Sequence, residues 1–566
     1  MRQLAAVADD PTQNRKLITS MWYDQQYESA PPKPYRRSAT LATALSLFVG
    51  WGLAQASAPA AQQQQEKPQP HFDVLEYRVL GNSMLQIRDI ERLLYPLLGK
   101  DKQLPDVEAA RTALEKLYHD RGFGTVFVDI PPQEVNEGIV RLRVTEGRLR
   151  ERTISGARYF SERDVLAALP ASAPGTVPNL HELQRQITAL NGQTSDRSVV
   201  PVLKAGPAPG TMDIDLKVDD KLPLHGSVEL DDDYTIDTKP LRASVGLSYA
   251  NLFAALDTLS LQYQDSPQAP SAVNVLNVAY QTRPLWDDIR LSFSFIDSNS
   301  NVATAGTGGG PVGVLGKGQI FSLRMTDPLI ATPESQQSLT LGLDYKHFRN
   351  TVAVGGASAL VTPIYYTNVS AGYAGAWNRA PAEGSLDVTA NFGPRGAPNG
   401  ADDFENDRYL ARPNYFYVRA DGSVTGHLPL GFRLSLRLAG QWTAEPLISN
   451  ENFSMGGADG VRGYLSAEEL GDTGIKGSVQ LQSPTWSWQV PQLVNVFIYY
   501  DDGHTHLLDP LSSQPTSATL RSWGGGLDLL PGHSFSGMLA WADPLANGSY
   551  TLAHQSRVLF LFRGAF

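Results

Sequence analysis

The pattern of hydrophobic and polar positions changes near residue 223. Before that point, apolar side chains recur at helical spacing between short strand-like runs, and after it apolar and polar residues alternate. A period near 3.6 is typical of amphipathic helices, whereas a period of two predicts strands with one apolar face. The alternation is clearest at 241–249, 259–263, 339–345 and 432–438. The sequence therefore predicts an α+β part followed by an all-β part.

The α+β part contains two copies of one small unit, at 72–148 and 149–222. In the first copy, a strand-like run at 72–80 precedes helical patterns at 87–98 and 107–118 and strands at 125–130 and 139–144. The second copy repeats this order, and Gly156 takes the place of Gly81. A tandem β-α-α-β-β repeat indicates an interaction scaffold. Its sheet edges can accept an extended chain by strand addition.

The all-β part, 223–566, predicts a transmembrane antiparallel barrel. Its strands are about ten residues long and aromatic residues stand near strand ends, as in membrane barrels. At roughly 20 residues per strand and connection, the segment holds about sixteen strands. Closure pairs every backbone group in lipid, which an open sheet cannot do. The last strand places Val558, Phe560, Phe562 and Phe566 on one face, and this aromatic ending resembles the C-terminal assembly signal of bacterial outer-membrane barrels.

Composition excludes several other classes. The net charge of −11 argues against nucleic acid as a partner, because binding to phosphate requires a basic surface. Eighteen consecutive apolar residues occur nowhere, so helical membrane spans are not predicted. The chain has no cysteine and no motif of a nucleotide-binding or proteolytic site. The glycines at 308, 310 and 313 open no helix and are interpreted as a loop. We expect no enzyme, no cofactor and no metal site.

The N-terminal part of the sequence has the pattern of a targeting signal. Arg36 and Arg37 precede an apolar run at 41–53 and the small residues of 54–58, which is the pattern of a cleaved secretory signal. We therefore assign residues 1–58 to an N-terminal extension and signal peptide. Residues 59–71 are rich in Gln and Pro and read as a linker.

Two short motifs interrupt the all-β pattern. One lies in a long connection, 443–474, and comprises Gly456, Gly457, Val461, Arg462, Gly463, Tyr464, Gly471, Asp472 and Gly474. The other ends a strand that starts at Val494, and comprises Tyr499, Asp501 and Gly503. Val496, Ile498 and Tyr500 are the apolar set of this strand, so Phe497, Tyr499 and Asp501 should face the lumen. A guanidinium can bind an inward carboxylate through two hydrogen bonds. We therefore predict an Arg462–Asp501 ion pair that anchors the connection inside the barrel.

These motifs resemble the lumen-loop and barrel-wall motifs of the Omp85 superfamily, and in particular of the two-partner-secretion transporters of the hemolysin-activation and filamentous-hemagglutinin type. The run from Leu190 to Asp219 resembles their second POTRA domain. The resemblance implies two periplasmic POTRA domains and a barrel in the bacterial outer membrane. It implies export of a secreted partner protein, such as a large exoprotein, an adhesin or a cytolysin. It also implies contact with outer-membrane lipid and, during biogenesis, with the barrel-assembly machinery.

Some alternatives stay open at this point. An assembly factor that inserts other barrels belongs to the same superfamily, and a passive channel or receptor has the same wall. Members of the family often carry an N-terminal helix that plugs the barrel. Only about fourteen residues separate the cleavage site from Phe72, too few for such a helix unless the first forty residues are retained. The run Asp231-Asp232-Asp233 is interpreted as a solvated turn rather than a calcium site.

Overall fold

The computed structural model describes residues 71–566, except residue 136, 300–301, 308–309, 316, 333, 353–359, 396–399, 489–491, 513 and 531–533. The predicted signal peptide, almost all of the linker and any plug helix lie outside these residues. No helix within the described ranges is both long and apolar enough to cross a membrane.

The first repeat is a three-stranded sheet covered by two helices. Its strands are β2 (Glu76–Leu80), β5 (Ile139–Glu146) and β4 (Val126–Asp129), in that order across the sheet. The helices are α3 (Ile87–Leu94), followed by the 3-10 turn η2 (Tyr95–Leu97), and α4 (Leu104–Asp120). Helix α4 starts three residues earlier than the apolar pattern indicates, because Gln103 and Asp106 form a capping box there. A small ladder of β1 (Phe72–Val74) and β3 (Gly99–Lys102) was not predicted.

The second repeat has the same architecture. Its sheet order is β6 (Arg148–Ser155), β8 (Thr211–Asp220) and β7 (Arg197–Ala205). Helices α5 (Glu162–Ala168) and α6 (Leu180–Asn191) cover it, with a 3-10 turn, η3 (Pro170–Ser172), between them. In both repeats the first strand runs parallel to the last, which is the β-α-α-β-β order expected from the sequence.

Two equivalent glycines show why the repeat is visible in the sequence. Gly81 and Gly156 both follow the first strand with a positive φ, +89° and +92°. A Cβ built at Gly81 would lie 2.3 Å from the carbonyl oxygen of Val144, and one at Gly156 would lie 2.2 Å from that of Val218. Only glycine fits both the conformation and this close approach to the last strand.

The junction between the repeats is short. Only Gly147 separates β5 from β6. Asn179 caps α6 by accepting the amide of Glu182 (3.1 Å), and its side-chain amide donates to the carbonyl oxygen of Arg121, just after α4 (2.9 Å). The next amide, that of Leu180, donates to the carbonyl oxygen of Gly122 (2.7 Å). One residue therefore ties the start of a helix in the second repeat to the end of a helix in the first.

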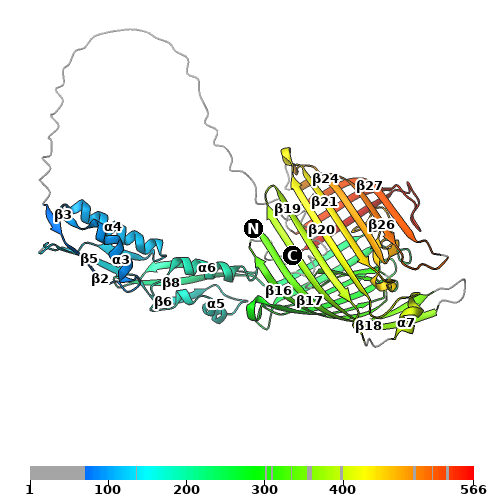
Figure 1. Ribbon diagram of the computed structural model, residues 1–566, viewed down its shortest axis with the longest axis horizontal. Helices are drawn as coiled ribbons and strands as arrows, with labels where there is room; N and C mark the ends of the chain where they lie inside the picture. Colours follow the sequence, from blue (N-terminus) through cyan, green and yellow to red (C-terminus); the bar gives the residue numbers. More distant parts are fainter. Residues whose placement is uncertain are drawn as a thin grey trace, which may run out of the picture. The chain divides into compact units, whose positions relative to one another are not determined.

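The all-β part forms a closed antiparallel barrel with tilted strands (Figure 1). Among the described residues sixteen strands make up the wall, if β24 and β25, which both pair with β26, are taken as one. The wall strands are β9 (Leu224–Asp231), β10 (Arg242–Leu252), β11 (Asp257–Asp265), β12 (Asn274–Gln281), β13 (Arg290–Ser298), β16 (Gly318–Ala331), β17 (Ser335–Val352), β18 (Leu360–Arg379), β19 (Ala382–Phe392), β20 (Phe416–His427), β21 (Arg433–Thr443), β24 (Thr473–Gln482), β25 (Trp486–Trp488), β26 (Gln492–His506), β27 (Ser517–Leu530), β28 (Phe535–Pro544) and β29 (Arg557–Ala565). Strand β29 pairs with β9 and closes the cylinder.

Several shorter elements lie in the connections. A hairpin of β14 (Val302–Thr307) and β15 (Gly310–Leu315) contains two of the three glycines that were interpreted as a loop, Gly310 and Gly313. Helix α7 (Ala401–Asp407) lies between β19 and β20. Two 3-10 turns, η4 (Trp286–Asp288) and η5 (Pro429–Gly431), belong to turns at the end where β9 begins.

The two faces of the wall differ as the alternation predicts. The apolar residues of the alternating runs, such as Leu247, Leu341 and Leu438, are exposed on the outer face. Their inward neighbours are polar and mostly buried, for example Ser248 and Asp344. Since the outer face of a membrane barrel contacts lipid, exposure of these leucines is the arrangement expected for a membrane-embedded wall.

Candidate functional site in the barrel lumen

The connection between β21 and β24 folds back into the barrel. We call residues 444–472 the lumen loop. It contains a 3-10 turn, η6 (Ser449–Glu451), and a short antiparallel ladder of β22 (Phe453–Met455) and β23 (Glu469–Gly471). Gly456 and Gly457 follow β22 and begin the tip, which carries the Val461–Tyr464 motif, and Gly474 lies in β24 beside Phe453.

The centre of the site is the contact between Arg462 and Asp501. The Nε and Nη2 atoms of Arg462 each donate to a different Asp501 oxygen, both at 2.8 Å, and the Arg462 backbone amide donates to the same carboxylate at 3.1 Å. The guanidinium also donates to Gln480 Oε1 and Ser478 Oγ on β24, both at 2.9 Å. Asp501 is completely buried. The sequence motifs thus meet as a bidentate pair, with two further guanidinium bonds to the wall.

Strand β26 presents this carboxylate inward. Phe497, Tyr499 and Asp501 are buried, whereas Ile498 and Tyr500 are exposed on the outer face. The guanidinium carbon of Arg462 lies 3.3 Å from the centroid of the Tyr499 ring, in cation–π contact. Phe497, Tyr499 and Asp501 thus point inward, as the alternation of apolar and polar residues along this strand predicted.

Other motif residues pack the tip against the wall. The Tyr464 hydroxyl lies within 2.9 Å of the carbonyl oxygen of Arg521 and 2.7 Å of that of Ala546. Val461 belongs to a buried cluster with Phe453, Met455, Tyr464 and Leu520. Gly463 has φ +94°, and a Cβ there would lie 3.1 Å from the Cβ of Ala542. Gly503 leaves room for this cluster, because its Cβ would lie 2.7 Å from Met455 Sδ.

Asp472 holds the two ends of the loop together. It is completely buried, and it accepts the backbone amides of Leu447 and Leu508, each at 2.7 Å. Arg408, which follows α7, pairs with the same carboxylate at 3.2 Å. Gly471, beside it, has no room for a Cβ, which would lie 2.7 Å from the Cβ of Thr505.

Further anchors were not found by reading the sequence. Glu468 accepts the backbone amides of Leu465 (2.9 Å) and Thr551 (2.7 Å), so it joins the tip to the connection that follows β28. Glu451, at the other end of the loop, contacts wall strands and is described below. From the sequence alone, a buried carboxylate in a connection cannot be told apart from one that faces water. The only available signal for Glu468 is its short distance along the chain from the Arg462 motif.

The interpretation of Asp231, Asp232 and Asp233 as a solvated turn was wrong. Asp231 is buried at the end of β9. Asp233 accepts the Ser466 hydroxyl and, at 3.3 Å, the Ala458 amide, so it binds the loop tip. Asp232 accepts the amide of Phe560 on β29. The carboxylates of Asp232 and Asp233 bind backbone amides and a hydroxyl on the loop tip and on the last strand instead of water. The donors are distant in sequence, so the residues next to 231–233 do not predict them.

Asp501 and its neighbour Asp502 point to opposite faces of β26. Asp501 faces the lumen and Asp502, on the outer face, pairs with Arg521 at 2.8 Å. Within the described ranges, no cluster of three or more His, Asp or Glu side chains is placed to hold a metal ion.

This architecture matches that of known protein families. The family model described as haemolysin secretion/activation protein ShlB/FhaC/HecB matches residues 210–529, and that of the ShlB-type POTRA domain matches residues 72–147. The outer membrane transporter CdiB of Dickeya dadantii (strain 3937) is 25% identical over 492 residues, which are 81% of this chain and 80% of that protein. The heme/hemopexin transporter protein HuxB of Haemophilus influenzae (strain 86-028NP) is 22% identical over 505 residues, 85% of each chain.

Solved structures share the fold. CdiB from Escherichia coli superimposes with a TM-score of 0.57 at 20% identity and covers 98% of both chains. BamA from Haemophilus ducreyi, lacking its POTRA domains 1–3, gives a TM-score of 0.54 at 13% identity, over 88% of this chain and all of that one. Because the ShlB/FhaC/HecB model spans more than half of the sequence, the chain belongs to the haemolysin secretion/activation family and is an outer-membrane transporter of the two-partner secretion type.

Proposed function

We propose that this transporter captures its partner as an unfolded, extended chain by strand addition to one defined edge of each POTRA sheet. The partner then passes through the lumen as the lumen loop moves aside. The observation that carries the proposal is that one edge of each sheet is blocked by side chains of its own domain.

The blocked edge of the first POTRA sheet is β4. The backbone amide of Val128 donates to the Glu115 carboxylate of α4 (3.1 Å), and Arg111 of α4 donates to the carbonyl oxygen of Val128 (3.2 Å). The blocked edge of the second sheet is β7, where Asn191 of α6 makes the same pair of bonds with Val199, at 2.8 and 3.0 Å. Side chains that occupy these main-chain groups compete with an incoming strand.

The edges that remain are β2 and the part of β6 that follows Leu149. The main chain of Leu149 is itself bonded to the 175–176 segment, its amide to the carbonyl oxygen of Thr176 (2.8 Å) and its carbonyl oxygen to the amide of Gly175 (2.6 Å). Within the part of the chain that the structure describes, β2 pairs only with β5, and β6 pairs only with β8. Strand β2 exposes Leu80, and β6 exposes Thr153. Addition to a strand edge uses main-chain hydrogen bonds, so it suits a partner that arrives unfolded and is read with little sequence selectivity.

Passage through the barrel requires the lumen loop to shift, because its tip is packed on several wall strands. We propose that the Arg462–Asp501 pair holds the closed position and that an arriving chain displaces it. Folding of the partner outside the cell supplies the direction of transport, without catalytic chemistry and without a cofactor. The partner class that fits is a secreted exoprotein, adhesin or cytolysin.

We further propose that Phe566 is the signal read by the barrel-assembly machinery before the outer face meets lipid. Its backbone pairs with Gly226 of β9 through two hydrogen bonds, at 3.0 and 3.1 Å, and its side chain is exposed. A Cβ at Gly226 would lie 2.3 Å from the Phe566 ring, so the ring has a place of its own at the seam.

Site-specific photo-crosslinking in cells tests the proposed capture. A photoreactive residue at Leu80 or Thr153, on the open edges, should form an adduct with a protein that is also found in the culture medium. The matched positions are Phe127 on β4 and Val200 on β7, which are also exposed but lie on blocked edges. Equal adduct yields at all four positions would refute capture at β2 and β6.

A further inference from the structure

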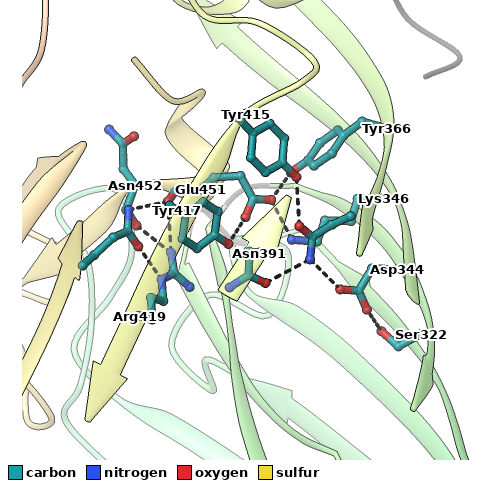
Figure 2. A network of polar contacts seen from close by, with 12 residues as sticks. Ser322, Asp344, Lys346, Tyr366, Asn391, Tyr415, Tyr417, Arg419, Glu451 and Asn452 are labelled. Atoms are coloured by element: carbon teal, nitrogen blue, oxygen red, sulfur yellow. Dashed lines mark hydrogen bonds and ion pairs between the residues drawn. The ribbon is translucent and has the colours of Figure 1, made fainter. Parts of the chain in front are cut away.

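A second set of contacts holds the lumen loop at Glu451, in η6. Figure 2 shows its carboxylate between the side chains of Tyr366 and Tyr417. The Glu451 side chain is 1% exposed, and it accepts from Lys346 Nζ at 2.6 Å, from the Tyr366 hydroxyl at 2.5 Å and from the Tyr417 hydroxyl at 2.6 Å. These donors stand on β17, β18 and β20. One loop carboxylate is thus bound by three wall strands.

The backbone of the loop is fixed at the same place. Arg419 on β20 donates to the carbonyl oxygens of Glu451 (3.0 Å) and Asn452 (3.2 Å). The amide of Gln441 on β21 donates to the carbonyl oxygens of Glu451 and Asp472, both at 3.0 Å. Arg419 in turn donates to the side-chain oxygen of Gln441. The contacts therefore order both the side chain and the main chain of the loop root.

An apolar seal surrounds this root. Leu447 and Ile448 precede η6 and are buried with inward side chains of the wall and with Phe404 of α7. The strands contribute to this cluster near their ends opposite to the start of β9, which in an outer-membrane transporter with periplasmic POTRA domains is the outer mouth. We call it the mouth cluster, and its members are Val273, Val275, Ile296, Ile320, Phe348, Ile364, Tyr366, Phe404, Ala411, Tyr415, Tyr417, Leu447 and Ile448.

We propose that Glu451 is a positioning residue that latches the root of the lumen loop and thereby keeps the outer mouth sealed, separately from the Arg462–Asp501 latch at the tip. This inference rests on the proposed gating by the lumen loop. The two latches have opposite polarity: at the tip a loop cation meets a wall carboxylate, and at the root a loop carboxylate meets a wall cation. They also use different wall strands, β24 and β26 for the tip and β17, β18 and β20 for the root.

The chemistry explains why such a latch has two states. A carboxylate with three charge-assisted hydrogen bonds is stable while buried, whereas the same group without them must reach water. Partial withdrawal of η6 is therefore unfavourable. Once these bonds are lost, η6 withdraws and takes Leu447 and Ile448 out of the mouth cluster. The outer mouth of the barrel is then no longer sealed.

The test uses the full-length chain in planar lipid bilayers, with ion conductance as the readout. Glu451→Gln keeps the size of the side chain but removes the charge, and it leaves Lys346 without its anionic partner. We expect the fraction of time in the conducting state to rise about tenfold or more, the factor that corresponds to loss of one charge-assisted hydrogen bond. Glu334→Gln, an exposed site between β16 and β17, is the matched control and should leave conductance unchanged.

Hydrogen exchange separates a released latch from a damaged fold. In Glu451→Gln, amides of 447–453 should exchange faster, while those of 458–466 at the tip should stay protected. Arg462→Ala should give the reverse pattern. Uniform acceleration in both segments, or conductance equal to that of the unmodified chain, overturns the proposal.

Two further outcomes separate this proposal from the gating proposal on which it rests. If Arg462→Ala opens the pore and Glu451→Gln does not, only the root latch fails. If neither variant changes conductance, gating by the lumen loop itself fails. Should Glu451→Gln not reach the membrane in a folded, heat-modifiable form, Tyr366→Phe combined with Tyr417→Phe removes only two hydroxyls and decides the question by the same measurements.

Discussion

Arginine 462 and arginine 521 form two Arg–Asp pairs with neighbouring residues of one strand, and their loss should have very different effects. Asp501 is completely buried and faces the lumen, whereas the Arg521–Asp502 pair is 54% and 43% exposed on the outer face. Arg462→Ala removes both side-chain bonds to Asp501 and leaves that carboxylate buried without its cation. Breaking a buried pair in this way costs about 3–5 kcal/mol. Removing an exposed pair costs about 0–1 kcal/mol.

Hydrogen exchange of the full-length chain measures this difference directly. A loss of about 3 kcal/mol in the closed position of the tip corresponds to roughly a hundredfold faster exchange of its amides. Arg462→Lys should give an intermediate value, because lysine keeps the charge but cannot form the bidentate contact. Export of the partner should fall in Arg462→Ala, since the closed and open positions of the tip are no longer distinguished.

Equal exchange rates of the tip amides in Arg462→Ala and Arg521→Ala would refute the predicted difference between the two pairs. Normal secretion by Arg462→Ala, with its loop still protected, would refute it as well. A double variant, Arg462→Ala with Asp501→Ala, provides a further check. Both residues take part in one contact, so the double variant should destabilise the closed position of the tip by less than the sum of the two single variants.

Three further predictions concern the POTRA domains. Gly81→Ala and Gly156→Ala should each destabilise their own domain by about 1–3 kcal/mol, because strain at a positive φ adds to a clash with a carbonyl oxygen; Gly175→Ala, with φ +85° but no atom within 4 Å, is the control in thermal unfolding. Burial raises the pKa of Tyr118 above its usual value near 10. The neutral phenol therefore contributes its full stability below pH 10, and this contribution is lost as the pH rises above that value. Tyr118→Phe should flatten the alkaline part of a plot of unfolding free energy against pH. Gly122→Ala would place a Cβ 2.3 Å from Asn179 Oδ1 and should broaden the distance distribution between spin labels in the two domains, a measurement made simple by the absence of native cysteines.

Alternation alone located the wall strands and the inward face of β26, because the side-chain period of a strand is fixed by backbone geometry. The inward direction of Phe497, Tyr499 and Asp501 therefore follows from the sequence, and these side chains are buried in the structure. The partner of Asp501 followed from charge and from the resemblance of the Arg462 motif to a known family. The fold class was predicted on the same two grounds.

The other anchors of the lumen loop could not be predicted. Glu451 binds Lys346, Tyr366 and Tyr417, which precede it by up to 105 positions on three different strands. Nothing local distinguishes such a carboxylate from a solvated one, and the same holds for Asp233. The blocked POTRA edges were missed for a related reason, since Asn191 and Glu115 lie on helix faces that the apolar pattern leaves undefined.

The short junction between the POTRA domains has a consequence for how a partner is held. Gly147 alone separates β5 from β6, and Asn179 ties the adjacent helix ends, so β2 and β6 are joined through a very short connection. A chain that engages one of these strands presents its next segment to the other at an effective concentration in the millimolar range, as for a short tether. Each contact can then be weak and exchange quickly while the chain as a whole stays bound. Under the proposed capture at β2 and β6, such bivalent retention would let the transporter hold its partner with avidity and still release it one segment at a time.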